Sequence, residues 1–283
     1  MDGRICVVTG ANSGLGRATA EGLARRGAHV VLLCRRPDAG AEAAEAVARG
    51  TGGSTELLVA DLTDPAAIAA AARTLAEGHG RVDVLVNNAG LYLPRRRETP
   101  EGLEATFATN HLGAFRLTRH LLPLMPRDGR VVVVASRSHA DGRLDPDDLQ
   151  RRRRPYGGYA AYADSKLANV LFVRELARRL GPHPTVNAVH PGTIGTDWAQ
   201  DEPGFMQRLF RVARPFMTTP AKGARGAIML ASDPALAELT GAYLSGVRPR
   251  RPARRARRDD DARRLWELSE ALSPGLPPLP SPR

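Results

Sequence analysis

The sequence contains little cysteine, little lysine and no long apolar run. Its 283 residues include only 2 cysteines, Cys6 and Cys34, and both lie inside apolar stretches. Free thiols in such stretches behave as small hydrophobic side chains, so we expect neither a disulfide framework nor a zinc site, and no metal ligands are predicted. No apolar run approaches the roughly 18 residues that a membrane-spanning helix requires, so no membrane span is expected.

The first residues also lack an export signal. The chain passes from residues 1–4 directly into the apolar run 5–8, without a charged segment, a long apolar segment and a cleavage site in succession. We therefore expect a cytoplasmic protein.

The formal net charge of +11 comes almost entirely from arginine, because Lys166 and Lys222 are the lysines among 41 basic residues. The arginines gather at residues 95–97, 151–154 and 248–264. None of these clusters is interleaved with the aromatic residues of a base-stacking surface. Solvated loops are therefore favoured over the alternative, a polyanion site, and no nucleic-acid partner is expected.

Short Val- and Leu-rich runs alternate with Ala-rich helical stretches along the chain. The expected strands are 5–9, 29–34, 56–60, 82–86, 130–135 and 185–190, and the expected helices are 14–27, 38–49, 65–78, 101–122 and 159–180. Continuous apolar runs are typical of strands that are buried on both faces of a sheet. The pattern predicts an α/β fold with a doubly wound parallel sheet in three layers, α/β/α, with its ligand at the carboxyl ends of the strands.

No linker divides the first part of the chain, so residues 1–247 are predicted to form one nucleotide-binding catalytic domain. Residues 248–261 are rich in charge and poor in apolar side chains, which predicts a mobile surface loop. Residues 262–272 have an apolar face typical of a helix packing on the domain, and the proline-rich residues 273–283 are expected to be a frayed tail.

A glycine-rich turn follows the first predicted strand, in the sequence Thr9-Gly10-Ala11-Asn12-Ser13-Gly14-Leu15-Gly16. Glycine allows the backbone to approach a pyrophosphate closely, and the first turn of the next helix offers unpaired N–H donors to the anion. The alternative is a turn that only connects strand to helix. The glycine spacing differs from the commoner dinucleotide motif.

The second predicted strand ends in Cys34-Arg35-Arg36, where NAD-binding sites commonly place a carboxylate. A guanidinium at this position can bind a 2′-phosphate through paired N–H donors, so NADP(H) is favoured over NAD(H). An exposed arginine pair without a ligand is the alternative. Asp61-Leu62 and Asn88-Ala89-Gly90 follow the third and fourth strands and fall at the same predicted edge.

Tyr162 and Lys166 lie four residues apart on a predicted helix, so they share one face. A lysine ammonium close to a phenol favours the phenolate, which predicts a lowered pKa for Tyr162 and a role as acid or base. Tyr156 and Tyr159 are nearby alternatives, but neither has a lysine four residues later.

Ser136 ends the fifth predicted strand, so its hydroxyl could donate a hydrogen bond to a substrate carbonyl. Asn110 lies within the helix after the fourth strand, where its amide could hold a water for proton transfer. Each could equally be an ordinary polar residue.

In their order and spacing, several motifs resemble the short-chain dehydrogenase/reductase family. They are the glycine turn at residues 9–16, residues 87–90, Asn110, Ser136, the pair of Tyr162 and Lys166, and Pro191-Gly192. The resemblance covers about residues 4–272. Residues 33–36, 110–113, 165–172 and 264–266 are similar to its retinol dehydrogenase and WW-domain oxidoreductase branch. The resemblance implies a Rossmann-type fold, NADP(H) as cofactor, and hydride transfer between an alcohol and an aldehyde or ketone.

The resemblance also implies residue roles. Tyr162 exchanges the proton with substrate, Lys166 binds the nicotinamide ribose and lowers the tyrosine pKa, Ser136 orients the carbonyl, and Asn110 supports the proton path. For the cofactor, the resemblance implies that the pyrophosphate is held by Gly10, Ser13, Gly14, Leu15 and Gly16, and the 2′-phosphate by Arg35. It also implies that the adenine is held by Asp61 and Leu62, and the region of the adenosine ribose by Asn88, Ala89 and Gly90.

Two departures from the family pattern are visible: Ala135 replaces the first serine of the usual pair, and no membrane anchor like that of animal retinol dehydrogenases is seen.

Residues 137–161 are expected to form a substrate-side flap with a solvated tip, the alternative being a passive surface loop. The substrate, a small and apolar carbonyl or alcohol, is not identified further, and a homo-oligomer remains open. A protein that binds NADP(H) as a redox sensor or scaffold without turnover is the competing hypothesis.

Overall fold

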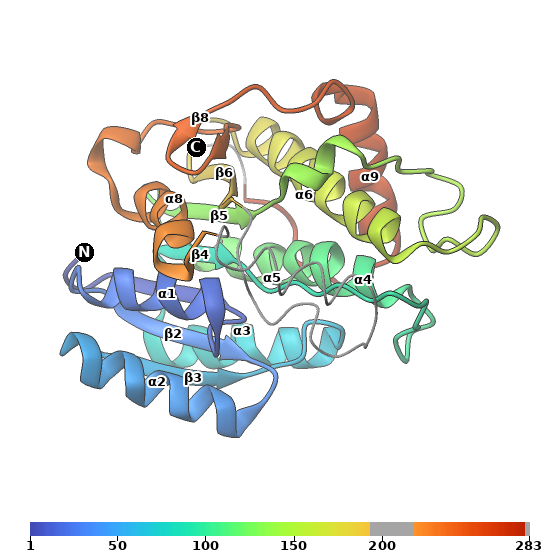
Figure 1. Cartoon of the computed structure of the whole chain (residues 1–283). Helices are drawn as coiled ribbons and strands as arrows, with labels where there is room; N and C mark the ends of the chain where they lie inside the picture. The colour runs from blue at the N-terminus through green and yellow to red at the C-terminus, as the bar shows by residue number, and fades with distance from the viewer. Residues whose placement is uncertain (193–217, 281–283) are drawn as a thin grey trace.

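One eight-stranded sheet organises the chain in a computed structural model that describes residues 1–192 and 218–280 (Figure 1). The strand order is β3-β2-β1-β4-β5-β6-β7-β8, and all neighbouring pairs are parallel except the last. The strands are β1 (Ile5–Thr9), β2 (His29–Cys34), β3 (Thr55–Val59), β4 (Val84–Asn87), β5 (Arg130–Val134), β6 (Thr185–His190), β7 (Tyr243–Ser245) and β8 (Arg248–Pro249).

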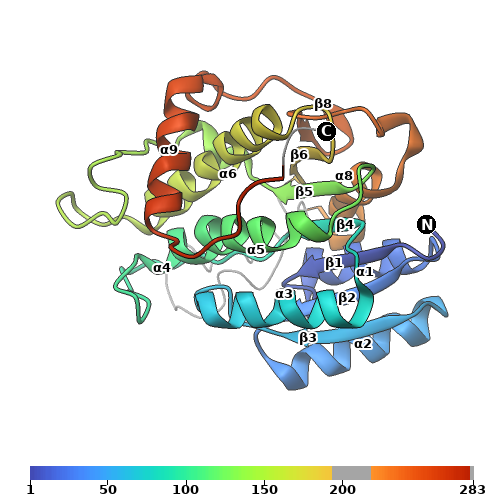
Figure 2. The same cartoon turned by 180° about the vertical axis from the view of Figure 1, so that it is seen from behind.

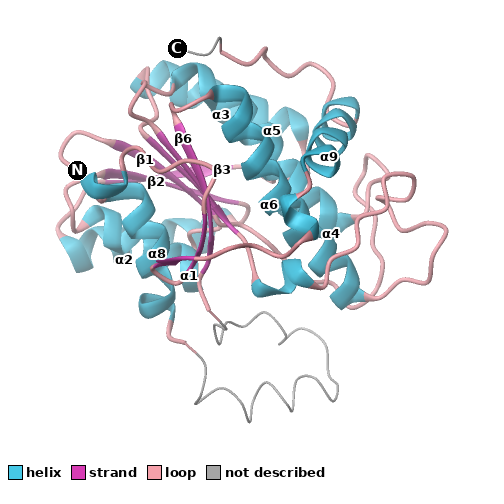
Figure 3. Ribbon diagram, turned by 90° about the horizontal axis from the view of Figure 1, so that it is seen from above, coloured by secondary structure: helices cyan, strands magenta, loops and turns pink. Residues whose placement is uncertain are grey.

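Helices cover both faces of this sheet. The longer helices are α1 (Gly14–Ala24), α2 (Pro37–Thr51), α3 (Pro65–His79), α5 (Gly113–Leu121), α6 (Gly158–Leu180), α8 (Pro220–Ser232) and α9 (Asp259–Ala271). Short helical turns are α4 (Ala105–Phe107), η1 (Ala108–Leu112), η2 (Leu122–Leu124), η3 (Arg137–Ala140), η6 (Pro234–Leu236) and η7 (Arg255–Arg257). Helices α1, α2 and α8 lie on one face, and α3, α5, α6 and α9 lie on the other (Figures 2 and 3).

The strands are buried on both sides, which explains their continuous apolar sequences. In β1, Val7 belongs to the core on the α3 and α5 face, whereas Cys6 and Val8 belong to the core on the α1 and α8 face. All three side chains have 0% exposure. Successive residues of a strand point to opposite faces, so each face of this sheet requires its own apolar set.

The predicted doubly wound, three-layer, single-domain fold is confirmed. All six predicted strands are present with ends shifted by at most two residues, as in β3 and β4. The predicted helix 101–122 differs from the observed helical segment, which begins at Ala105 and contains a π-helical stretch, η1. Strands β7 and β8 and helix α8 were not predicted.

The C-terminal part differs from the expected mobile loop and frayed tail. Residues 248–261 include β8, η7 and the first turn of α9, which starts at Asp259 rather than at residue 262. The described part of the tail crosses α5 (Figure 2), where Ser273 Oγ accepts a hydrogen bond from Arg116 Nε at 2.9 Å and Pro277 O accepts one from Arg119 Nη2 at 2.6 Å. Residues 281–283 of the predicted tail lie outside the described residues.

The segment between Ser136 and Tyr162 is anchored by a buried ion pair rather than by solvated arginines. Arg151 and Asp164 are each 7% exposed, and the Asp164 carboxylate accepts hydrogen bonds from Arg151 Nη2 at 2.7 Å and from Arg154 Nη2 at 3.2 Å. Its other oxygen accepts one from the backbone N–H of Arg143 at 2.6 Å. The segment is therefore tied to α6 through one carboxylate, and the expectation of solvated cations is wrong for Arg151.

Within residues 1–192 and 218–280, no helix combines the length and the apolar character needed to cross a membrane.

The Asp164→Asn variant is expected to lower the free energy of unfolding by about 3 kcal/mol, because it leaves the buried Arg151 guanidinium without its counter-charge. Chemical denaturation monitored by circular dichroism measures this. The control is Asp147→Asn, an exposed carboxyl in the same segment, for which a change of about 0.5 kcal/mol or less is expected. Equal stability of the two variants would show that the ion pair does not anchor the segment.

Candidate active site at the carboxyl ends of the strands

Hydrogen bonds join the carboxyl ends of β1 and β4. Thr9 Oγ1 accepts hydrogen bonds from the backbone N–H groups of Asn88 and Ala89, both at 2.9 Å. The Asn88 side-chain amide donates to Thr9 O at 2.7 Å. These bonds fix the glycine turn after β1 against residues 88–90 after β4.

The glycine turn has the close packing that a phosphate-binding turn requires. Gly10 and Gly14 adopt φ values of 63° and 53°. A Cβ on Gly16 would lie 2.3 Å from Gly10 O, and one on Gly10 would lie 3.0 Å from Ala89 Cα. The next helix, α1, has no acidic residue in its first turn, and Ser13 at its N-cap makes no side-chain capping bond. The residues present therefore fit a bound pyrophosphate, because this end offers backbone donors and no opposing negative charge. Leu15 is 9% exposed and belongs to the core on the α1 face, so its side chain serves packing.

Arg35 and Asp61 meet at the ends of β2 and β3. Arg35 Nη1 lies 3.9 Å from Asp61 Oδ2, and the Arg35 side chain is 67% exposed. The other Asp61 oxygen accepts hydrogen bonds from the N–H and the hydroxyl of Thr63, both at 2.8 Å. Leu62 is buried, and its carbonyl packs against Gly113. The guanidinium is thus held at the edge by a long ion pair and remains accessible.

Asn110 is fully buried in η1 and bridges two segments. Its Oδ1 accepts from Leu91 N at 2.7 Å, and its Nδ2 donates to Leu91 O and to Ser165 Oγ, both at 2.9 Å. Both amide hydrogens are therefore used within the protein, which leaves only Oδ1 able to accept from a water. These contacts give Asn110 a positioning contribution, and the expectation that its amide holds a water for proton transfer stays a prediction.

Lys166 is 4% exposed, and its ammonium donates to Val134 O at 3.0 Å. A Cβ on Gly90 would lie 3.3 Å from both Lys166 Nζ and Asn110 Oδ1, so these two polar groups flank the Gly90 backbone. Burial disfavours the charged form and lowers the pKa of Lys166 to about 8.

Tyr162 lies beside Lys166 and Ser136. Lys166 Nζ lies 5.5 Å from the centre of the Tyr162 ring. Burial raises the pKa of Tyr162 to about 12, and a hydrogen bond with Ser136 acts in the opposite direction. The predicted lowering of this pKa by Lys166 is therefore not seen, because burial penalises the phenolate more than the hydrogen bond with Ser136 favours it.

The neighbouring tyrosines do not share this position. Tyr159 is 53% exposed and donates to Asp141 Oδ2 at 2.6 Å, and Tyr156 donates to Glu104 Oε1 at 3.0 Å. Each hydroxyl thus has a carboxylate partner elsewhere.

Two further residues contribute to the candidate site and were not predicted from the sequence. Ser165 Oγ accepts from Asn110 and donates to Tyr162 O at 2.7 Å, and the Tyr92 ring packs edge-on against Tyr162 with centres 6.4 Å apart. Ser165 is adjacent to Lys166 in the sequence, but only the fold reveals that it links η1 to α6.

The parallel sheet and the glycine turn at its carboxyl edge are typical of dinucleotide-binding α/β proteins. A family model described as short chain dehydrogenase matches residues 4–205. The chain belongs to the short-chain dehydrogenase/reductase family, on its retinol dehydrogenase-like branch.

Similar proteins include human retinol dehydrogenase 14, which is 38% identical over 96% of this chain and 87% of its own length. An uncharacterised protein from Mycobacterium paratuberculosis has a similar structure, with a TM-score of 0.80 and 38% identity over 98% of this chain and 96% of that one. A short-chain dehydrogenase from Shigella flexneri complexed with NADP has a TM-score of 0.69 and 26% identity, over 87% of this chain and 98% of that one.

The lowered pKa of Lys166 predicts a pH-dependent stability. Between pH 8 and about 10.5 the unfolded chain still holds the lysine proton that the folded chain has released, so stability rises with pH in this window. From pH 8 to about 10.5, the free energy of unfolding of the wild type, measured relative to that of Lys166→Met, is expected to increase by about 3 kcal/mol. The reason is that a pKa difference of one unit between folded and unfolded chain corresponds to about 1.4 kcal/mol. Below pH 8 the difference is expected to be constant.

Urea denaturation at a series of pH values measures this, with Lys222→Met as the control because Lys222 is exposed on α8. The same pH trend in both lysine variants would contradict the assignment to burial of Lys166.

Proposed function

We propose that this protein is an NADP(H)-dependent oxidoreductase that interconverts an apolar aldehyde or ketone and the corresponding alcohol, with Tyr162 as the acid and base. The observation that carries the proposal is the convergence of Tyr162, Lys166, Ser136 and Asn110 at the edge that also bears the glycine turn.

Tyr162 is proposed to exchange a proton with the substrate oxygen through its Oη atom. Ser136 is positioned to orient that oxygen, because its hydroxyl lies at the N-cap of η3 and hydrogen bonds with Tyr162. When bound, NADP(H) supplies or accepts the hydride. At neutral pH the Tyr162 phenol carries its proton, so in the direction of carbonyl reduction it is proposed to donate that proton to the substrate oxygen.

Lys166 and Asn110 are proposed to support this proton transfer. The Lys166 ammonium has three donors, and Val134 O accepts one of them. The others are proposed to hold the hydroxyls of the nicotinamide ribose. Asn110 keeps Leu91 and Ser165 in place around the helix turn that carries Tyr162.

The preference for NADP(H) rests on Arg35. It is an accessible guanidinium at the end of β2, at a position where an acidic residue would favour NAD(H). The similar Shigella flexneri protein was solved with NADP, which is consistent with this proposal.

The competing hypothesis is a redox sensor or scaffold that binds NADP(H) without turnover. The position of Tyr162 beside the buried Lys166 favours an enzyme, because Lys166 could serve cofactor binding alone, whereas an acid or base at Tyr162 is needed only for turnover. Incubation with NADPH and a panel of aldehydes and ketones that includes retinal, followed by nicotinamide absorbance, separates the two hypotheses. The retinoid is included because similar proteins are named retinol dehydrogenases.

Tyr162→Phe is expected to reduce the turnover rate by about 10²- to 10⁴-fold while leaving the dissociation constant of NADPH nearly unchanged, since only the proton-transfer hydroxyl is removed. Steady-state kinetics and NADPH fluorescence titration measure the two effects. Tyr159→Phe is the control and is expected to retain activity, because its hydroxyl bonds Asp141 at the surface. If Tyr162→Phe turned over at the wild-type rate, the acid would have to be another group.

Arg35→Ala is expected to weaken NADPH binding at least about tenfold, because each charge-assisted hydrogen bond to a phosphate contributes about 1.5 to 3 kcal/mol. NADH lacks the 2′-phosphate, so its affinity is expected to stay within about twofold and serves as the internal control. Arg49→Ala, at the far end of α2, should change neither affinity. An unchanged ratio of NADPH to NADH affinity in Arg35→Ala would contradict this assignment.

A further inference from the structure

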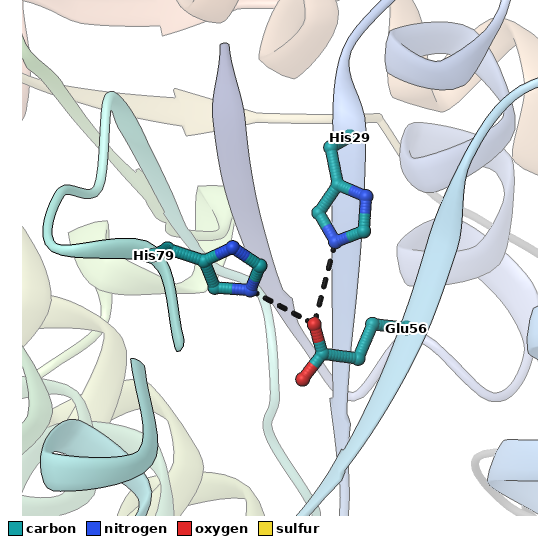
Figure 4. A group of neighbouring side chains, drawn as sticks. All are labelled: His29, Glu56 and His79. Carbon is teal, nitrogen blue, oxygen red and sulfur yellow. Dashed lines mark hydrogen bonds and ion pairs between the residues drawn. The ribbon is translucent and has the colours of Figure 1, made fainter. Parts of the chain in front are cut away.

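Two histidines and one glutamate converge at the opposite edge of the sheet from the proposed active site. His29 is the first residue of β2, Glu56 lies near the start of β3, and His79 is the last residue of α3. Figure 4 shows both imidazole rings directed at one carboxylate oxygen of Glu56. His79 Nε2 lies 2.8 Å from Glu56 Oε2, and His29 Nε2 lies 3.4 Å from the same atom.

The fold places these residues on one face. Along β2, His29 points to the same face of the sheet as Val31 and Leu33, and along β3, Glu56 points to the same face as Leu58. Val31, Leu33 and Leu58 belong to the core beneath α3. In the parallel pairing of β2 with β3, Glu56 lies opposite Val31. Helix α3 runs over this face and delivers His79 at its C-terminus, so three separate elements contribute to one cluster.

The three ligand atoms have a spacing close to that of a metal site. All three atoms lie within 4.8 Å of one another. With metal–ligand bonds of about 2.0 to 2.1 Å and tetrahedral angles, neighbouring ligand atoms lie roughly 3.3 Å apart. The two nitrogen–oxygen distances, 2.8 and 3.4 Å, are near this value, and the two nitrogens lie within 4.8 Å of each other, so an ion bound by all three atoms would draw the imidazoles together.

A fourth side chain orients one ligand. Ser54 Oγ lies 2.7 Å from His29 Nδ1. If this oxygen accepts the Nδ1–H, the lone pair of Nε2 is left for a metal, which is the usual arrangement around a metal-bound histidine. The side chains of His29, Glu56 and His79 are 24%, 36% and 18% exposed, which permits an ion to enter.

We propose that His29, Glu56 and His79 bind a divalent transition-metal ion of the zinc class through Nε2, Oε2 and Nε2, with water in the remaining position. Two imidazoles favour Zn²⁺, Ni²⁺, Cu²⁺ or Co²⁺ over Mg²⁺ and Ca²⁺, which prefer oxygen ligands. This departs from the expectation that the chain has no metal ligands, which rested mainly on its cysteines. The cluster was not apparent in the sequence because its members are 27 and 23 residues apart and belong to different elements.

The position of the site indicates a structural ion. β3 is an edge strand of the sheet, paired only with β2 in the described sheet order. An ion held by β2, β3 and α3 would cross-link that edge, and since the ligands assemble only in the folded chain, binding would stabilise the fold. Tyr162 and Lys166 lie with the opposite, carboxyl ends of the strands, so the proposal is independent of the proposed catalytic function.

The test is titration of Zn²⁺ into protein that was purified without a histidine tag and stripped with EDTA. Isothermal titration calorimetry is expected to show one equivalent bound. Zn²⁺ at about 100 times its dissociation constant is expected to raise the melting temperature by roughly 5 °C. Co²⁺ is expected to give the visible absorption of a four- or five-coordinate site, which solvent-exposed Co²⁺ lacks.

Variants distinguish this site from general metal binding. His79→Gln is expected to weaken Zn²⁺ binding at least about tenfold, and Ser54→Ala about tenfold, because outer partners of metal ligands typically contribute 10- to 100-fold. The matched control is His183→Gln. His183 Nε2 pairs with Glu238 Oε2 at 3.2 Å, and within residues 1–192 and 218–280 this pair gathers no third ligand.

Absence of Zn²⁺ binding to the wild type would overturn the proposal and leave the cluster as a hydrogen-bonded group of side chains. Unchanged affinity in His79→Gln, or an equal loss in His183→Gln, would overturn it as well. Circular dichroism checks that each variant is folded. If His79→Gln is not, Glu56→Gln replaces it, because that substitution keeps the shape of the side chain and removes only the charge of the ligand.

Discussion

The parallel alignment of β1, β4 and β5 is the constraint on which the proposed active site depends. Val8 pairs with Val86, and Asn87 pairs with Val133, so the three strands end at one edge. A one-residue slip would exchange the two faces of a strand, and here both faces are packed against apolar cores. The register of the strands is therefore fixed by the packing of both faces of the sheet. The hydrogen bonds of Thr9 with Asn88 and Ala89 can form only because this register brings the strand ends together.

The same packing separates the pKa values of two neighbouring groups. Phenol and ammonium have similar pKa values in water, about 10 and 10.4. Burial favours the neutral form of each, so it raises the pKa of Tyr162 to about 12 and lowers that of Lys166 to about 8. Sequence spacing alone suggested attraction between a cation and a developing phenolate. In the folded chain, removal from water is the larger effect, and it favours the protonated phenol and the neutral amine.

Periodicity and motif spacing were sufficient to predict the strands and helices that have long apolar patterns. They were insufficient to predict the other elements. β1 and β2 each contain a run of at least four apolar residues, and they were predicted with their observed bounds. β7 has only three residues and β8 only two, and such short strands are defined by their partners rather than by a pattern of their own. The π-helical η1 was not predictable from periodicity, although it contains Asn110. Asn110 makes long-range hydrogen bonds with Leu91 and Ser165, which sequence periodicity does not reveal.

The arginine content shows why composition alone misleads about partners. Arg116 is 2% exposed and bonds to Glu101, to Ser273 and to the carbonyl of Leu272. Arg119 is 5% exposed and bonds to Glu270 and to Pro277 O. A guanidinium offers five N–H donors in a fixed plane, so one side chain can bind a carboxylate and a backbone carbonyl together, whereas a lysine ammonium acts as a single point charge. These two arginines hold the end of α9 and the residues after it against α5. These two guanidinium groups are therefore committed to contacts inside the fold and do not form part of a surface for a polyanionic partner.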